Sequence, residues 1–258
     1  MPCEALRRLD AFGVEIPHLY FKSVMDYRGR LVTAESVGRY LQQEKNRFAE
    51  IAHFLPQKPR LDARLLDIGI AYGFLAVLLQ ENKGWKCEGL ELPENIPVYC
   101  TFASTHKIAV HPGKLGIKPL PLVDSSFDAI VFSEVLEHLR ISPSLVFAEL
   151  RRLLMPGGFL LLTTPNLARF TNIAKLWVGR NILEPFPKGI ESENITEHLT
   201  HIREYTMQEV VDLLKNNGFR IRQAHFSSCM EKQRLHHWLT AWVPPWRGSL
   251  MVLAEKVS

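Results

Sequence analysis

A short turn of small residues is the first feature of this sequence that could do chemistry. The apolar run Leu65–Ile68 leads into Gly69, Ala71 and Gly73 at alternate positions, and an apolar helical pattern follows. Small residues between a strand and a helix let a ligand approach the backbone, where the helix N-terminus offers free N–H groups. The spacing G-x-A-x-G differs from the G-x-G-x-x-G of dinucleotide sites, and Asp67 precedes it. A carboxylate there would repel a pyrophosphate, but it suits the amino group of a cationic ligand.

A second carboxylate, Glu91, ends the next apolar run about twenty residues beyond the turn. An acidic residue at this spacing can accept hydrogen bonds from both hydroxyls of a ribose. The alternative is a solvated glutamate at the end of a strand. The spacing relative to the small-residue turn favours the ribose interpretation.

A third group of ionisable residues follows the apolar run that ends at Phe132. It consists of Ser133, Glu134, Glu137 and His138. His138 is a candidate general base for a hydroxyl acceptor, because the ordinary pKa of histidine lies near neutrality. The alternative is that Glu137 and His138 only cap and orient this turn.

Two more histidines, His198 and His201, lie in the later stretch EHLTHIREYT. They could reach an acceptor as a base or as a ligand. The alternative is a polar loop that packs against a lid.

The elements that must position these groups are predicted by a regular alternation of apolar strands and helices. Such alternation predicts a parallel sheet with helices on both faces, an α/β doubly wound, Rossmann-like fold. The predicted strands are Arg64–Ile68, Lys86–Glu91, Ile108–His111, Phe127–Phe132, Phe159–Thr163, Phe219–Phe226 and Leu250–Lys256. We expect residues 1–60 to form a helical lead-in with an amphipathic helix over Ser36–Leu55, and residues 61–258 to form the main domain. A further helix is expected over Met207–Asn216.

The segment Asn166–His201 interrupts this alternation after the carboxyl end of a predicted strand, which makes it a candidate lid over the acceptor. Its apolar stripe of Leu167, Phe170, Ala174 and Trp177 is typical of core packing, with an acceptor pocket or a peripheral membrane contact as alternatives. Farther on, the stretch from His236 to Gly248 holds three tryptophans. They could cover the lid, form a dimer contact or touch lipid.

The order of these motifs resembles that of the class I S-adenosylmethionine-dependent methyltransferases. The first motif of that family is matched by LLDIGIAYG, the second by GLEL with Glu91, the fourth-strand motif by SSFDAIVFSEVLEHL, the following helix and strand by ELRRLLMPGGFLLLTTPN, and a later block of the bacterial branch by HIREYTMQEVVDLLKNNGF. The resemblance runs from about Arg64 to Lys256. Ala71 replaces the usual second glycine, and Lys114 and Leu115 stand where an acidic residue often holds the adenine amino group.

The resemblance implies methyl transfer from S-adenosyl-L-methionine on a seven-stranded sheet whose last strand is antiparallel. The residues expected to bind this cofactor are Asp67, Gly69, Ala71, Gly73 and Glu91, with Phe132 and Ser133 near its methionine end. The candidate catalytic residues are His138 and His201. The later block and the lid resemble bacterial enzymes that methylate small molecules, glycans or lipid-linked intermediates, and we expect O-methylation of such an acceptor.

A metal-dependent alternative also rests on a resemblance. The E-x-x-E-H pattern of Glu134, Glu137 and His138, together with His201, resembles the metal site of small-RNA 3′-end 2′-O-methyltransferases. The same pattern occurs in methyltransferases without a metal, and the lid carries mixed charge. We therefore expect no metal and no nucleic-acid acceptor, with methylation of an RNA ribose as the alternative.

Composition adds only broad bounds. The net charge of +4 allows an anionic partner without requiring one. The four cysteines show no metal-ligand spacing, and no apolar run is long enough to span a bilayer. We expect a cytoplasmic protein with free thiols. Two other classes are a nucleotide-binding oxidoreductase, which the turn spacing disfavours, and a cofactor-binding partner subunit without catalysis. The sequence names neither the acceptor nor the oligomeric state.

Overall fold

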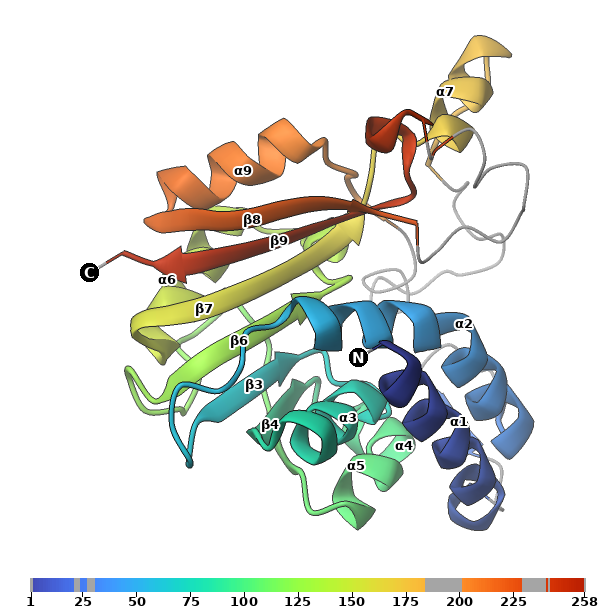
Figure 1. Cartoon of the computed structure of the whole chain (residues 1–258), viewed down its shortest axis with the longest axis vertical. Coiled ribbons are helices and arrows are strands. Elements are labelled where there is room, and N and C mark those ends of the chain that lie inside the picture. The colour runs from blue at the N-terminus through green and yellow to red at the C-terminus, as the bar shows by residue number, and fades with distance from the viewer. Residues whose placement is uncertain are drawn as a thin grey trace.

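The computed structural model describes residues 2–20, 24–26, 31–183, 201–228, 240 and 242–257. Its centre is a seven-stranded sheet in the order β5-β4-β3-β6-β7-β9-β8 (Figure 1). The strands are β3 Arg64–Ile68, β4 Lys86–Glu91, β5 Ala109–Pro112, β6 Phe127–Ser133, β7 Leu154–Pro165, β8 Phe219–Ser227 and β9 Ser249–Lys256. A small hairpin pairs β1 Val24–Met25 with β2 Leu31–Val32.

The connectivity confirms the doubly wound α/β fold. Strands β3 to β7 pair in parallel, while β9 is antiparallel to both β7 and β8. The expected antiparallel last strand is thus confirmed. From β3 the chain proceeds outward through β4 and β5, then returns to add β6 on the other side of β3. Ligands of such sheets bind at this switch point, outside the carboxyl ends of the strands.

Helices cover both faces of the sheet. They are α1 Pro2–Leu19, α2 Ala34–Phe54, α3 Phe74–Lys83, α4 Ile96–Tyr99, α5 Thr101–Thr105, α6 Pro143–Leu153, α7 Phe170–Trp177 and α9 Met207–Asn216, with short 3₁₀ turns η1 Leu136–His138 and η2 Pro244–Trp246. Successive strand side chains point to opposite faces. Accordingly Leu65 belongs to one apolar cluster, with residues of α1, α2, α3 and α5, and Leu66 to a second cluster, with residues of α6 and α9.

The lead-in shares the first of these clusters with the sheet. Helix α2 begins at a capping box in which Thr33 accepts from the Ser36 N–H and Ser36 accepts from the Thr33 N–H. This cap places the start of the helix two residues before the predicted Ser36. The buried face of α2 includes Val37, Leu41 and Ile51, which lie in one cluster with the side chains of α3.

Most predicted elements agree closely with the structure. Strands Arg64–Ile68 and Lys86–Glu91 and helix Met207–Asn216 have the predicted bounds. Strand β7 begins at Leu154 rather than Phe159, because Leu154 pairs with Phe127 across the intervening glycines. Residues 184–200 of the segment expected to form a lid, among them His198, and residues 229–239 lie outside the described part of the chain. Within the described residues, no helix has both the length and the apolar character needed to cross a bilayer.

Candidate functional site

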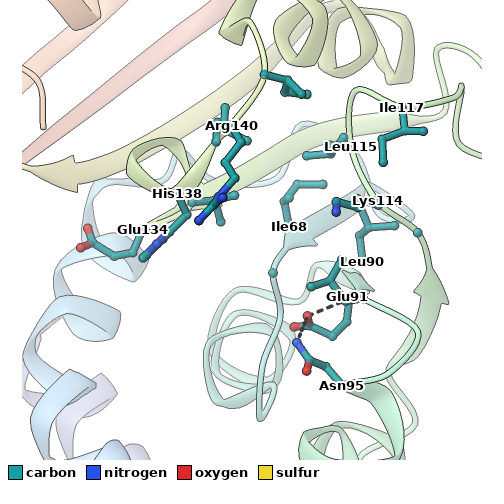
Figure 2. Close-up of a pocket in the computed structure, with 16 residues that line it drawn as sticks. Ile68, Leu90, Glu91, Asn95, Lys114, Leu115, Ile117, Glu134, His138 and Arg140 are labelled. Carbon is teal, nitrogen blue, oxygen red and sulfur yellow. Dashed lines mark hydrogen bonds between the residues drawn. The ribbon is translucent and has the colours of Figure 1, made fainter. Parts of the chain in front are cut away.

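Two adjoining cavities lie at the carboxyl ends of β3, β4 and β6. The first, of about 510 Å³, is shown in Figure 2 and includes Glu91 and Asn95 in its lining. The second has a volume of about 360 Å³. Gly69, Glu134 and His138 line both cavities, so the two spaces meet above the small-residue turn. Together they form one elongated site at the switch point of the sheet.

The turn after β3 needs left-handed backbone at each of its small residues. The φ angles are +71° at Gly69, +49° at Ala71 and +85° at Gly73. Ala71 therefore occupies a conformation that is unfavourable for residues with a Cβ atom. At Gly73 an added Cβ would lie 2.5 Å from the Ala103 Cβ of α5. Glycine is required at that position by helix packing as well as by backbone conformation.

The Glu91 carboxylate fixes this turn to the end of β4. It is buried, and its Oε2 accepts from the Ala71 N–H at 2.9 Å. Its Oε1 accepts from the Leu92 N–H and from Asn95 Nδ2, both at 2.9 Å. A carboxylate has about four acceptor positions, so roughly one is left. Glu91 therefore has a structural role in addition to any contact with a ligand.

Asn95 adds an acceptor that the sequence did not indicate. Its side chain is buried and faces Glu91 inside the first cavity (Figure 2). Its Nδ2 donates to Glu91, while its Oδ1 is buried and has no hydrogen-bond partner among the described residues. A buried acceptor without a partner costs free energy unless a ligand or water satisfies it. The Glu91–Asn95 pair thus offers two acceptor positions for neighbouring hydroxyl groups.

The rest of the first cavity is largely apolar. Leu115, Ile117 and Ile141 line it, and Lys114 stands at the same wall (Figure 2). No acidic residue occupies the position of Lys114 and Leu115, as the sequence indicated. A flat aromatic base bound here would rest on aliphatic side chains.

Asp67 lies at the floor of the second cavity. Burial, and to a lesser degree the nearby Glu91 carboxylate, raise the pKa of Asp67 to about 7, with Arg47 acting in the opposite sense. Such a carboxyl group holds a proton just below neutral pH and loses it when a cation binds. A cationic group that binds beside Asp67 therefore favours the ionised form of its carboxyl group.

Arg47 is a site residue that sequence analysis missed. It projects from α2, the lead-in helix, and is only 7% exposed. It forms ion pairs with Glu44 at 2.9 Å and with Glu134 at 3.5 Å, while its Nε is buried without a hydrogen-bond partner in the described residues. A buried guanidinium with a spare donor is suited to a carboxylate ligand. Its place in the helix gave no signal in the sequence, because Arg47 stands among other polar and charged residues such as Lys45 and Asn46.

The residues at the carboxyl end of β6 and just beyond it divide between the site and the core. Ser133 Oγ and Thr163 Oγ1 are 2.8 Å apart, and Thr163 Oγ1 donates to Glu134 Oε1 at 2.9 Å. Ser133 and Glu134 line the second cavity. Phe132 instead is fully buried in the second apolar cluster, where its ring packs edge-on against Phe147, and it is not among the residues that line either cavity. Any role of Phe132 at the methionine end would have to pass through its backbone.

Two histidines far apart in the sequence meet beside Glu137. The ring centroids of His138 and His201 are 5.0 Å apart, and both side chains line the second cavity. Backbone bonds bring His201 there, because the Glu137 carbonyl accepts from the Ile202 N–H at 2.8 Å. Ligating atoms of Glu137, His138 and His201 lie within 4.8 Å of one another. Glu134 is not part of this group.

Carboxylates lie beside both histidines, Glu204 next to His201 and Glu137 next to His138. A hydrogen bond to Glu204 raises the pKa of His201, with burial acting in the opposite sense. Burial raises the pKa of Glu137, whose Oε2 accepts from Thr164 Oγ1 at 3.1 Å and whose Oε1 is buried without a hydrogen-bond partner in the described chain. His138 Nε2 lies 3.9 Å from Glu137 Oε1. The arrangement can accept a proton or orient a polar acceptor.

Comparison with known proteins places this chain in a family. A methyltransferase domain family matches residues 39–224. A probable S-adenosylmethionine-dependent methyltransferase of Mycolicibacterium smegmatis is 33% identical over 61% of this chain and 52% of its own length. A malonyl-[acyl-carrier protein] O-methyltransferase of a Marinomonas species is 31% identical over 52% of this chain and 50% of its own. The match thus spans about half the length of these relatives.

Solved structures agree on the fold. A SAM-dependent methyltransferase from Archaeoglobus fulgidus superimposes with a TM-score of 0.57 at 16% identity, covering 84% of this chain and 99% of the other. The family match includes the small-residue turn, Glu91 and the residues after β6, which line the joined cavities. The chain belongs to the class I S-adenosylmethionine-dependent methyltransferases.

Proposed function

We propose that this chain transfers a methyl group from S-adenosylmethionine to a hydroxyl oxygen of a small molecule, a glycan or a lipid-linked intermediate. The observation that carries the proposal is the joined pair of cavities, with two neighbouring acceptors at one end, opposite charges at the other and a histidine pair beside them. The O-methyltransferase named above supports transfer to oxygen. S-adenosylmethionine, when bound, supplies the methyl group from its sulfonium centre.

The first cavity is proposed to hold the adenosine. Glu91 and Asn95 share the ribose, with Glu91 accepting one hydroxyl at its free position and Asn95 Oδ1 accepting the other. This division follows from the three bonds that Glu91 already accepts. The base then lies against the aliphatic wall, near Lys114 and Leu115.

The second cavity is proposed to hold the amino-acid end. Asp67 carries a negative charge for the ammonium group, and Arg47 carries a spare donor, its Nε, for the carboxylate. Gly69, Ala71 and Gly73 bring the backbone close to both groups. An amino acid zwitterion matches this pairing of charges, whereas a pyrophosphate would meet Asp67 and Glu134.

His138 is the proposed general base, because it lines both cavities and therefore stands where they meet. It takes the proton from the acceptor hydroxyl while the oxygen bonds to the methyl carbon and the carbon–sulfur bond breaks, with its electron pair passing to sulfur. His201, held by Glu204, packs edge-on against the His138 ring and orients it. The insertion from Asn166 to His201 is the proposed lid.

An acceptor screen tests this function directly. Candidate alcohols, glycans and lipid-linked compounds are incubated with the protein and S-adenosylmethionine, and S-adenosylhomocysteine release is measured. We expect turnover with at least one hydroxyl compound and its loss in His138→Ala. Cofactor binding without turnover on any acceptor would favour the partner-subunit alternative.

Metal-assisted methylation of an RNA ribose is the second candidate, favoured by the close approach of Glu137, His138 and His201. Glu134 departs from the four-ligand pattern, because its Oε1 accepts from Thr163 and faces Arg47. Metal analysis of the purified protein and a chelator assay separate the two functions. We expect no stoichiometric cation and no chelator effect. Loss of turnover with chelator and its return with added metal would put the RNA reaction first.

A further inference from the structure

The tip of helix α7 carries apolar side chains in contact with solvent. Leu176, Trp177 and Val178 are 58%, 88% and 69% exposed. In Figure 1 this helix projects from the body of the molecule, beyond the end of β7. Exposed apolar side chains that adjoin one another can mark a surface that binds a partner or a membrane.

The base of the same helix is firmly anchored. Both terminal nitrogens of Arg169 donate to the buried Glu204 at 2.8 Å, and Asn172 Nδ2 donates to it at 2.7 Å. The Phe170 ring lies 5.6 Å from that of Trp246. Of the apolar stripe in this segment, Leu167 and Phe170 are half-buried, and Phe170 packs on Trp246 rather than in the core. The last turn is held out in solvent rather than folded back on the core.

The charged residues around the tip are all basic, which favours an anionic partner. Residues 166–183 contain Arg169, Lys175 and Arg180 and no aspartate or glutamate. Arg169 is engaged by Glu204, whereas Lys175 and Arg180 are exposed on either side of the apolar tip. Tryptophan and leucine flanked by lysine and arginine are typical of segments that lie at the headgroup level of an anionic bilayer.

A second exposed aromatic residue lies in the segment that contacts α7. Trp242 is 77% exposed, and it precedes η2, whose Trp246 packs on the base of the helix. Two chain segments far apart in sequence, one after the carboxyl end of β7 and one before the amino end of β9, thus present aromatic side chains to solvent. Tryptophan is enriched where one side of a ring meets lipid and the other water.

We propose that the tip of α7 docks this chain on an anionic phospholipid surface. Leu176, Trp177 and Val178 insert among the headgroups, and Lys175 and Arg180 contact the lipid phosphates. Glu204, which anchors α7, also accepts from His201 Nδ1 at 3.2 Å. Glu204 therefore contacts both the docking helix and His201, and this shared contact would keep the histidine pair close to the lipid surface. The proposal goes beyond the methyl transfer and does not depend on it.

Co-sedimentation with vesicles tests the docking. One set of vesicles contains phosphatidylglycerol mixed with phosphatidylcholine, and the other contains phosphatidylcholine alone. We expect the wild type to bind the anionic set, with binding that falls as salt is added. Trp177→Ser should weaken this binding about tenfold or more, and Lys175→Glu with Arg180→Glu should weaken it by a comparable factor.

The matched control is Leu61→Ser, because Leu61 is 86% exposed and precedes β3 at the amino end of the strand, opposite the site. It should bind vesicles as the wild type does. Equal binding by wild type and Trp177→Ser, or equal loss in Leu61→Ser, would overturn the proposal. Sedimentation analysis would also overturn it if Trp177→Ser dissociated a dimer without changing vesicle binding, because the apolar tip would then bind a second copy of this chain. Calorimetry with S-adenosylhomocysteine on each variant tests the cofactor site separately.

Discussion

The shared ribose site of Glu91 and Asn95 gives the sharpest test of the cofactor geometry. Asn95→Leu has nearly the same shape and removes the unpartnered Oδ1 together with the bond from Nδ2 to Glu91. The lost ribose bond to a neutral acceptor corresponds to about 0.5–1.5 kcal/mol, or roughly a two- to tenfold loss of affinity. Glu91→Ala should lose a charge-assisted bond of about 1.5–3 kcal/mol, or roughly 10- to 150-fold.

The two variants should also differ in stability. Glu91→Ala leaves the Ala71 N–H without its carboxylate and frees the turn after β3, so the melting temperature should fall. Asn95→Leu removes a buried acceptor that lacks a partner, which offsets the loss of its bond to Glu91. The exposed neighbour Glu94→Ala is the matched control and should change neither quantity.

Titration calorimetry with S-adenosylhomocysteine, together with thermal unfolding, measures both effects. Wild-type affinity in Asn95→Leu would refute the shared site and leave the ribose to Glu91 alone. Wild-type affinity in Glu91→Ala would refute the ribose assignment altogether. The double variant should lose less than the sum of the two single losses, because the residues contact each other.

Four further outcomes are expected. Asp67 has a pKa of about 7, above its ordinary value, and must ionise to hold an ammonium group, so cofactor affinity measured by calorimetry should rise about tenfold from pH 6 to pH 8. Asp67→Asn should remove this pH dependence. A wild-type affinity that does not change with pH would contradict the role of Asp67. Arg47→Met should weaken S-adenosylhomocysteine binding roughly 10- to 150-fold through the lost carboxylate contact, while the exposed Arg39→Met on the same helix should have no effect. Gly73→Ala should destabilise the fold by about 2–5 kcal/mol in denaturant unfolding, from left-handed strain and the clash with Ala103, and an unchanged midpoint would argue against both causes. Hydrogen exchange over residues 166–201 should slow when S-adenosylhomocysteine binds, and equal strong protection in both states would make the segment core rather than lid.

Most of the fold could be predicted from the sequence, because the patterns that indicate strands and turns are local. Near-continuous apolar runs such as Phe127–Phe132 identify strands buried on both faces, and small residues after Ile68 mark a turn that needs left-handed backbone. Both signals, the apolar run and the small-residue turn, depend only on residues that are close together in the sequence. For the same reason Asp67 and Glu91, which end adjacent parallel strands, could be assigned to one site before their contacts were known.

Groups that act through contacts between distant segments were harder to assign. Arg47 enters the site only because α2 packs beside α3, and Asn95 is distinguished only by the acceptor left unpaired once its amide bonds Glu91. The family resemblance placed Phe132, the last residue of a predicted strand, near the cofactor, but alternation along β6 turned its side chain into the core.

By itself the sequence determined the order of strands and helices, the ligand-binding turn and the family, because these are written in periodicity and in short motifs. Only the tertiary structure decided which polar groups meet. It brought His201 beside His138 through a backbone bond to Glu137, and it left the apolar tip of α7 in solvent where core packing was one interpretation. Side-chain partners and exposure depend on how distant segments pack, and no local pattern encodes that packing.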